Sequence, residues 1–353
     1  MIRIEAFAAD DGARMAEFAA LRAPIGYPGA DEPVSPGARC LLARRGDEPV
    51  ARLAFTMADG LHDAPGRTGL IGWYEAVHAE AGAELLAHAA RTLAADGAVR
   101  VLGPVNGSTW GRYRLALPPD PADGDAEPPY LSEPTNPPEY PSHFLAAGFR
   151  AAAAYESAVV EDLSRPDPRR DELAERVRAR GATVRPLDLD RFDDELRALY
   201  GLSVEAFARN LFYSPIGWDE FRARYLPLRP ILDPALVRMA EGADGRLLGF
   251  VFAFPDLLTM RDGRPTRAVL KTLATAPAAR GLGLGTFLSD EVRRIAHEKG
   301  YAAVVHALMQ ADNASIAISR HTARVFRRYA LYAWTAGNAG PPSSREAGYP
   351  PGP

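Results

Sequence analysis

Residues 273–286 read LATAPAARGLGLGT, and this stretch decides the fold. A strand-like apolar segment runs into it, and Gly281, Gly283 and Gly285 follow at alternate positions before a helical pattern begins. Glycine permits positive φ and lets a ligand approach the backbone closely. The freed N–H groups and the N-terminus of the following helix predict an anion site suited to a pyrophosphate. The alternative is a tight strand-to-helix turn that binds no ligand.

Two common phosphate loops do not fit this stretch. A Rossmann loop requires G-x-G-x-x-G and an acidic residue about 20 positions later, but the spacing here is G-x-G-x-G and the corresponding residue is Val305. A Walker loop requires Lys and Ser or Thr directly after its last glycine, where this chain has Thr286 and Phe287. The spacing R-x-x-G-x-G, formed by Arg280, Gly283 and Gly285, resembles the acyl-CoA loop of the GNAT N-acyltransferases.

The resemblance extends over residues 182–335, because the elements around the loop follow in the order and spacing of that family. It implies that pantetheine lies along the strand before the loop and that the pyrophosphate lies in the loop, with acetyl-CoA (or another acyl-CoA) as co-substrate. The implied cofactor-binding residues are Leu273, Thr275, Arg280, Gly281, Leu282, Gly283, Leu284, Gly285, Thr286, Asn313 and Ser315.

The two halves of the chain repeat one order of strands and helices, which predicts an α/β fold (α+β mixed sheet) with two tandem GNAT-like domains. Each domain is expected to hold a central, mostly antiparallel mixed sheet flanked by helices. The expected parts are a degenerate GNAT-like domain at 1–163, a linker and helix at 164–181, a GNAT N-acyltransferase domain at 182–335 and a disordered tail at 336–353. The strands expected around the loop are 268–275 and 302–308, with a helix over 286–299 between them.

The first half lacks the acyl-CoA loop. At the equivalent place it has the single Gly82 and no basic residue, and Glu80 and Glu84 stand where phosphates would bind. Carboxylates at a helix N-terminus repel an anion. We therefore expect this half to bind no CoA.

Acyl transfer to an amine requires a free-base nucleophile, a polarised carbonyl and an acid for the leaving thiolate. GNAT enzymes often place a tyrosine acid in an N-x-x-A-x-x-L-Y pattern, but counting from Asn313 this position is Arg320. Tyr329 and Tyr332, on the last expected strand, are the candidate replacements. Packing in the core or at a sheet edge is the alternative for both tyrosines.

Two residues are candidate bases. His306 lies on the strand after the loop helix and has a reference pKa near neutrality; the alternative is a hydrogen-bonded histidine within the sheet. Asp256 ends a strand that faces the same cleft and is suited to bind or deprotonate an amine, or else to cap a turn.

An aromatic-rich helical region lies where GNAT enzymes build the wall for the acceptor. Tyr213, Trp218 and Phe221 are its candidate substrate-binding residues, and burial in the core is the alternative.

Composition narrows the function classes. The 353 residues include 41 Lys and Arg against 45 Asp and Glu, a net charge of −4, so no basic footprint for nucleic acid is present. Cys40 is the single cysteine, and no His, Cys or Asp spacing suits a metal, so we expect no metal site. No signal peptide or membrane-length apolar run is visible, and we expect a soluble, cytoplasmic protein that does not bind membranes.

The function expected is transfer of an acetyl or other acyl group from acyl-CoA to an amine by direct attack in a ternary complex, in the C-terminal domain. The acceptor is a small-molecule or peptide amine, and the chain is a monomer or homodimer. The main alternative is a non-catalytic protein that binds and senses acyl-CoA. A transferase that uses aminoacyl-tRNA fits less well, because those double-GNAT proteins lack the CoA loop that this chain retains.

Overall fold

The structure is a computed structural model that describes residues 1–22, 32–63, 66–120, 127–311 and 322–338. We call residues 1–163 the N-terminal half and the remainder the C-terminal half. The elements of the N-terminal half are β1 (Ile2–Ala8), α1 (Gly12–Ala20), β2 (Arg39–Arg45), β3 (Glu48–Ala58), β4 (Thr68–Ala76), α2 (Ala79–Ala95), β5 (Arg100–Gly103), β6 (Leu115–Ala116), α3 (Tyr140–Ala146) and β7 (Arg150–Val160).

The C-terminal half begins with a helix and repeats the same order. Its elements are α4 (Arg170–Ala179), β8 (Thr183–Pro186), α5 (Phe192–Phe207), α6 (Trp218–Tyr225), β9 (Val237–Glu241), β10 (Leu247–Pro255), β11 (Met260–Arg261), β12 (Arg264–Pro265), β13 (Arg267–Thr275), α7 (Leu284–Glu298), β14 (Ala303–Gln310) and β15 (Arg324–Trp334). Of the expected disordered tail at 336–353, Ala336–Asn338 form a 3-10 turn, and 339–353 lie outside the described residues.

One mixed sheet of 13 strands runs through both halves, in the order β1-β2-β3-β4-β5-β15-β7-β14-β13-β10-β9-β8 with β6 beside β15. Most neighbours are antiparallel; β4 with β5 and β13 with β14 are the parallel pairs. The α/β class with a mostly antiparallel mixed sheet flanked by helices is therefore confirmed.

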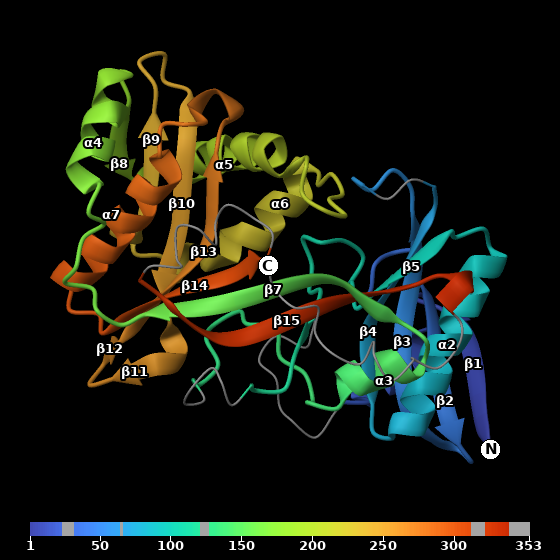
Figure 1. Cartoon of the computed structure of the whole chain (residues 1–353). Helices are drawn as coiled ribbons and strands as arrows, with labels where there is room; N and C mark the ends of the chain where they lie inside the picture. Colours follow the sequence, from blue (N-terminus) through green and yellow to red (C-terminus); the bar gives the residue numbers. More distant parts are fainter. Residues whose placement is uncertain (23–31, 64–65, 121–126, 312–321, 339–353) are drawn as a thin grey trace.

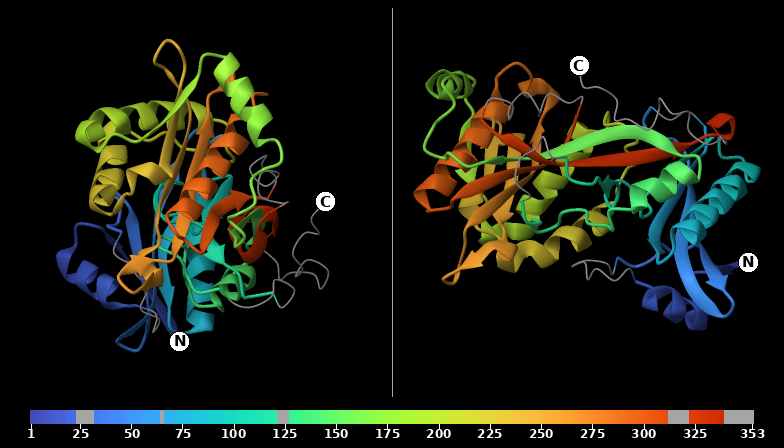
Figure 2. Two further views of the ribbon diagram at one scale, coloured as in Figure 1. Left: turned by 90° about the vertical axis from the view of Figure 1, so that its left-hand side faces the viewer. Right: turned by 60° about the horizontal axis from the view of Figure 1, so that its bottom comes forward.

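The closing strands of the two halves are exchanged. β15, expected at the end of the C-terminal domain, pairs with β5 of the N-terminal half, where Tyr332 lies opposite Gly103. β7, from the N-terminal half, pairs with β14, where Val160 lies opposite Val304. The two strands also pair with each other and run lengthwise through the middle of the molecule (Figures 1 and 2). Each half of the sheet is thus completed by a strand from the other half of the chain.

Helices cover the sheet because their apolar residues recur on one face. In α7 the buried residues Leu284, Leu288, Val292 and Ile295 follow the helical period and pack on β10 and β13. The opposite face of these strands is covered by α5 and α6, and α2 covers β3 and β4 in the N-terminal half (Figure 1).

Candidate active site

The parallel strands β13 and β14 part in the middle of the C-terminal half. They pair from Arg267 with Ala303 to Leu270 with His306, and their pairing stops there. Each strand is irregular where they part: Lys271 is an extra residue opposite β10, and Ala307 and Leu308 together face one residue of β7. Leu308 has φ +58, a strained value for a leucine. Bulges of this kind re-aim side chains and end strand pairing next to active sites.

The glycine loop lies where β13 leads into α7. Gly281 has φ +79, and Gly283, with φ +72, is the residue before the first turn of α7. No side chain caps this helix and its first turn holds no acidic residue. Arg280 is exposed beside it. The N–H groups and the partial positive charge of the helix N-terminus are therefore suited to a phosphate.

Helix α4, the helix expected within 164–181, packs against this loop. A Cβ atom on Gly283 would lie 2.3 Å from the Cδ2 atom of Leu173, so only glycine fits there. Arg176 donates to the carbonyl oxygen of Gly281, and Arg170 forms ion pairs with Asp290 and Glu291 of α7. Helix α4 therefore supports the backbone of the loop from one side.

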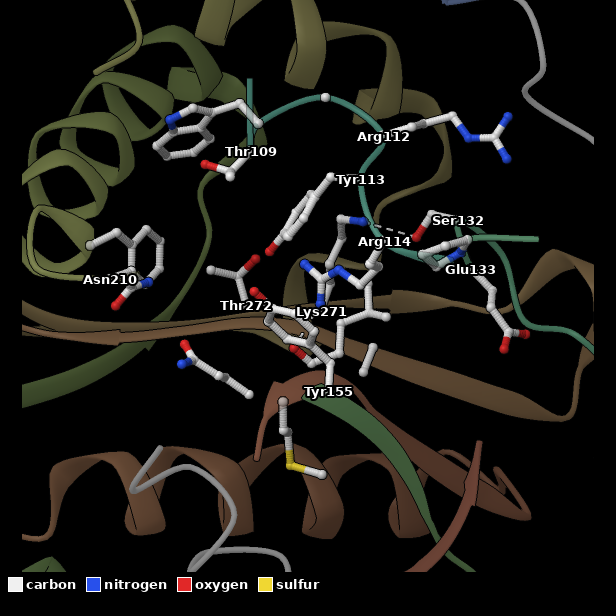
Figure 3. A pocket seen from close by; sticks show the side chains of 18 of the residues that line it. Thr109, Arg112, Tyr113, Arg114, Ser132, Glu133, Tyr155, Asn210, Lys271 and Thr272 are labelled. Carbon is white, nitrogen blue, oxygen red and sulfur yellow. Dashed lines mark hydrogen bonds between the residues drawn. The ribbon is translucent and has the colours of Figure 1, made fainter. Parts of the chain in front are cut away.

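A cleft of about 550 Å³ lies at the point where the strands part. Its floor includes Lys271 and Thr272 of β13, and residues 306–310 of β14. The N-terminal half supplies residues 109–114, 132–134 and Tyr155 as another wall. Figure 3 shows Lys271, Arg114, Tyr113 and Tyr155 gathered around this space. The cleft is therefore built by both halves of the chain.

The comparisons with known proteins agree with this geometry. The profile of the acetyltransferase (GNAT) family matches residues 201–320, from within α5 to beyond β14. Residues 201–320 form a GNAT domain. Membership of this family supports an N-acyltransferase class in general terms. No match was found among curated protein sequences.

Solved structures share the fold over most of the chain. A tandem GNAT protein from the clavulanic acid biosynthesis pathway is 16% identical, with 97% of this chain and 100% of that chain covered at a TM-score of 0.51. A probable N-acyltransferase from Enterococcus faecalis is 8% identical, with 95% of this chain and 72% of that chain covered at a TM-score of 0.55. A GCN5-related N-acetyltransferase from Anabaena variabilis is 10% identical, with 94% and 72% covered at 0.51. The likeness is one of fold, and it is consistent with a second GNAT-like unit in the N-terminal half.

The residues expected to bind CoA lie along β13, the loop and the start of α7. Leu273 lines the cleft, and Thr275 ends β13. Leu284 is buried in the core under α7, and Leu282 packs at its edge, so the GNAT domain offers their backbone to a ligand more readily than their side chains. Asn313 and Ser315 lie outside the described residues, as does Arg320.

His306 lies in the cleft of the GNAT domain, with 7% of its surface exposed. Burial lowers its pKa to about 4, so the imidazole is neutral near pH 7. It is therefore suited to accept a hydrogen bond, and it is a weak base.

Asp256 is fully buried and does not line the cleft. Its Oδ2 accepts hydrogen bonds from Arg267, at 2.9 Å from Nε, and its Oδ1 accepts from the backbone N–H groups of Leu131 and Leu258. These partners match the turn-capping alternative, and they occupy both carboxylate oxygens. We do not carry Asp256 forward as a base.

The two candidate acids are both buried. Tyr329 donates to Glu133 at 2.6 Å, and burial raises its pKa well above the ordinary value, so it keeps its proton. Tyr329 does not line the cleft itself; its hydroxyl contacts Glu133, which does, and Ser157, which accepts from the N–H of the cleft residue Leu308. Tyr332 packs on Phe144 in the core of the N-terminal half, at 5.5 Å between ring centroids. This placement matches the packing alternative for Tyr332.

Of the three aromatic residues expected in the acceptor wall, Tyr213 lines the cleft. Trp218 stacks under Arg197 outside it, and Phe221 is buried behind the wall, against Tyr225 and Trp110. Trp110, from the N-terminal half, is the aromatic residue that completes the wall.

Sequence reasoning missed most of the cleft residues, among them Tyr113, Arg114, Tyr155 and Lys271. For Lys271 a signal was present, because one of only two lysines in the chain interrupts an apolar strand directly before the glycine loop. The other three come from the N-terminal half, and nothing in the sequence joins them to β13.

Two further properties concern the described residues only. None of their helices has the length and apolar character needed to span a bilayer. No three metal-ligating side chains come together in this part of the chain.

Proposed function

We propose that the GNAT domain transfers an acetyl group from acetyl-CoA to an amine by direct attack in a ternary complex. One observation carries the proposal: among the described residues, the edge of β13 that faces β14 is unpaired beyond Leu270. It leads from the cleft at Lys271, through the 3-10 turn Pro277–Ala279, to the glycine loop before α7. An extended chain with a phosphate at one end and a thioester at the other fits this path.

The phosphates are proposed to bind the N-terminal N–H groups of α7, next to Arg280. Pantetheine amides are proposed to pair with the free edge of β13 beyond Leu270, as an added strand does. The thioester then lies near the bulge at Lys271, where both halves close around it.

The proposed chemistry needs a proton donor for the leaving thiolate. Tyr155 of β7 lines the cleft, and burial raises the pKa of its hydroxyl, so it is protonated at neutral pH. We assign it this donor role in place of Tyr329 and Tyr332. His306, with its pKa near 4, cannot hold the proton of an amine; it is proposed to orient the attacking N–H as a neutral acceptor. The amine must therefore react from its free-base fraction and release its proton to solvent.

The test is thiol release from acetyl-CoA across a panel of amines, together with calorimetric binding of acetyl-CoA. Arg280→Glu should weaken acetyl-CoA binding at least about tenfold, since it places a negative charge beside the phosphates. Arg261→Glu on the exposed strand β11 is the matched control and should bind as the wild type does. Tyr155→Phe should lower kcat about 10–100-fold with little change in binding. Binding without thiol release for every amine would favour the sensing alternative.

A further inference from the structure

The cleft contains an arginine, Arg114, that has no carboxylate partner among the described residues. Arg114 ends the segment 104–114 with φ +70 and is 7% exposed. Its guanidinium lies between the rings of Tyr113 and Tyr155, at 3.7 and 3.9 Å from their centroids. Nη1 donates to the carbonyl oxygen of Leu308 at 3.3 Å, and the buried Nε has no hydrogen-bond partner. Within the described residues, no carboxylate lies within 4.0 Å of it.

Lys271 is a second cation in the same cleft. It is the extra residue of β13, and its Nζ lies 3.0 Å from the hydroxyl of Ser132. Across the part of the chain that the structure describes, no carboxylate forms an ion pair with it. Burial, and then the charge of Arg114, lower its pKa to about 8, so the ammonium is still largely protonated at pH 7.

The two carboxylates that line the described cleft, Glu133 and Glu32, form ion pairs with other arginines. Glu133 binds Arg327 at 2.9 Å and accepts from Tyr329 at 2.6 Å. Glu32 binds Arg224 at 2.8 Å and accepts from the backbone N–H of Arg112. Among the described residues, Arg114 and Lys271 thus have no carboxylate partner. The charge of the buried Arg114 costs free energy until an anion is bound.

That anion is not expected to be a phosphate of CoA. Lys271 lies four residues before the end of β13, roughly 13 Å along the strand from Thr275, and the glycine loop begins only beyond that residue. The part of CoA that passes along this stretch is pantetheine, which is uncharged. The acceptor is the other molecule that occupies the cleft.

We propose that the acceptor amine also bears a carboxylate, as an amino acid does, and that Arg114 and Lys271 bind this carboxylate. The inference rests on the proposed transferase function and names its class of substrate. Arg114 supplies a fixed planar donor between two rings, and Lys271 supplies a point charge on the floor. The amine of the same molecule is then free to face the thioester.

The experiment compares matched acceptors that differ only in the carboxylate: L-phenylalanine with 2-phenylethylamine, L-tyrosine with tyramine, and L-lysine with cadaverine. We expect kcat/KM to favour the acid of a pair at least about tenfold, since a charge-assisted hydrogen bond is lost in its partner. Lys271→Met should remove most of that preference, because kcat/KM should fall much further for the acid than for the decarboxylated amine. Lys299→Met, at a surface ion pair with Asp233, is the matched control and should keep the preference. Equal losses for acid and amine would overturn the proposal, because Lys271 would then act on the reaction itself.

A second measurement does not depend on turnover. In the Lys299→Arg variant, Lys271 is the remaining lysine, and its labelling by trinitrobenzenesulfonate is followed by peptide mass spectrometry. We expect 3-phenylpropionate to slow labelling several-fold and 2-phenylethylamine to have no effect. Protection by the amine, or by neither compound, overturns the carboxylate site. Protection by the carboxylate without thiol release from any acceptor would leave this site standing and refute the transferase function instead.

Discussion

The two parallel strand pairs of the molecule are built alike and end differently. In the N-terminal half, β4 and β5 pair from Thr68 to Leu70 and then part, as β13 and β14 do after Leu270. There, however, the chain fills its own gap: the N–H of Val105 donates to the carbonyl of Ile71, and Asn106 accepts from the N–H of Trp73, both at 2.7 Å. The equivalent gap in the C-terminal half is an open cleft.

The helices α2 and α7, which connect the two strands of each pair, differ in the charge of their first turn. The first turn of α2 contains Glu80, whereas the first turn of α7 contains no acidic residue. Gly82 of α2 faces the hydroxyl of Tyr74, where a Cβ atom would lie 2.1 Å away, so this glycine serves packing. The comparison teaches that the same order of strands and helices can enclose either a filled gap or an open cleft. We propose that acyl-CoA binding needs both the open gap and a helix start free of negative charge.

The largest expected effect comes from giving α7 the charge that α2 carries. Gly283→Glu should weaken acetyl-CoA binding at least about a thousandfold, or roughly 4 kcal/mol, because a carboxylate and a displaced backbone replace the phosphate site. Calorimetric titration measures the change. Gly263→Glu, in the β11–β12 hairpin, has a similar φ of +77 and open space, and it should bind normally. Since Leu173 abuts Gly283, the variant is repeated with Leu173→Ala; near wild-type affinity in either folded variant refutes the loop assignment.

The next effect concerns how the wall from the N-terminal half is fixed to the C-terminal half. Asp256→Asn should lower the free energy of unfolding by roughly 3 kcal/mol, since it removes the buried partner of Arg267 and leaves only the longer ion pair with Glu127. Arg267 also holds the carbonyls of Pro128 and Pro129. Chemical denaturation measures it. Asp233→Asn also removes a turn cap and an ion pair, but its partner Lys299 is exposed, so the loss should stay near 1 kcal/mol. A tenfold loss of kcat without loss of stability would restore Asp256 as the base.

A smaller effect is expected when the filled gap is loosened. Asn106→Ala leaves the N–H of Trp73 without its acceptor and should destabilise the protein by about 1–3 kcal/mol. Acetyl-CoA should still bind once per chain, because Glu80 remains at the start of α2. Binding of two acetyl-CoA molecules per chain, in the variant or the wild type, would show that the N-terminal half also binds acetyl-CoA.

The smallest effect is a change in pH dependence at the open gap. His306 has a folded pKa near 4 against about 6.5 in an unfolded chain, so the unfolded state binds more protons between these values. Stability should therefore fall as pH drops from 6.5 towards 4, by at most about 1.4 kcal/mol per pH unit from this group. His306→Gln should show a flatter Tm between pH 4.5 and 7. An unchanged slope would mean that the imidazole is not buried as described.

The sequence predicts those elements of the fold that have a local pattern of their own. The glycine spacing identified the strand, loop and helix from β13 to α7 because each element carries its own periodic signal. Helix α7 was expected from 286 and begins at Leu284, a shift that reflects the left-handed glycine before it. The apolar strand around Lys271 was also recognised.

The missing parts depend on contacts between distant positions. The exchange of β7 and β15 leaves no local trace, since a strand pattern does not name its partner. Asp256 is a candidate base in the sequence because it ends a strand expected to face the cleft. Its ion-pair partner Arg267 lies on another strand, so no local pattern shows that pair. Arg114 and Tyr155 were missed for the same reason: they face β13 only once both halves are folded together.

The exchange of closing strands has a consequence for synthesis of the chain. Gly103 pairs with Tyr332, so the N-terminal sheet stays open until β15 has been made and has left the ribosome. Until then β5 presents a free edge, and such edges are templates for unwanted pairing with other chains. The nascent protein must hold this edge apart from its neighbours until β15 emerges. A stop codon just before β15 would therefore damage the half of the protein that was made first.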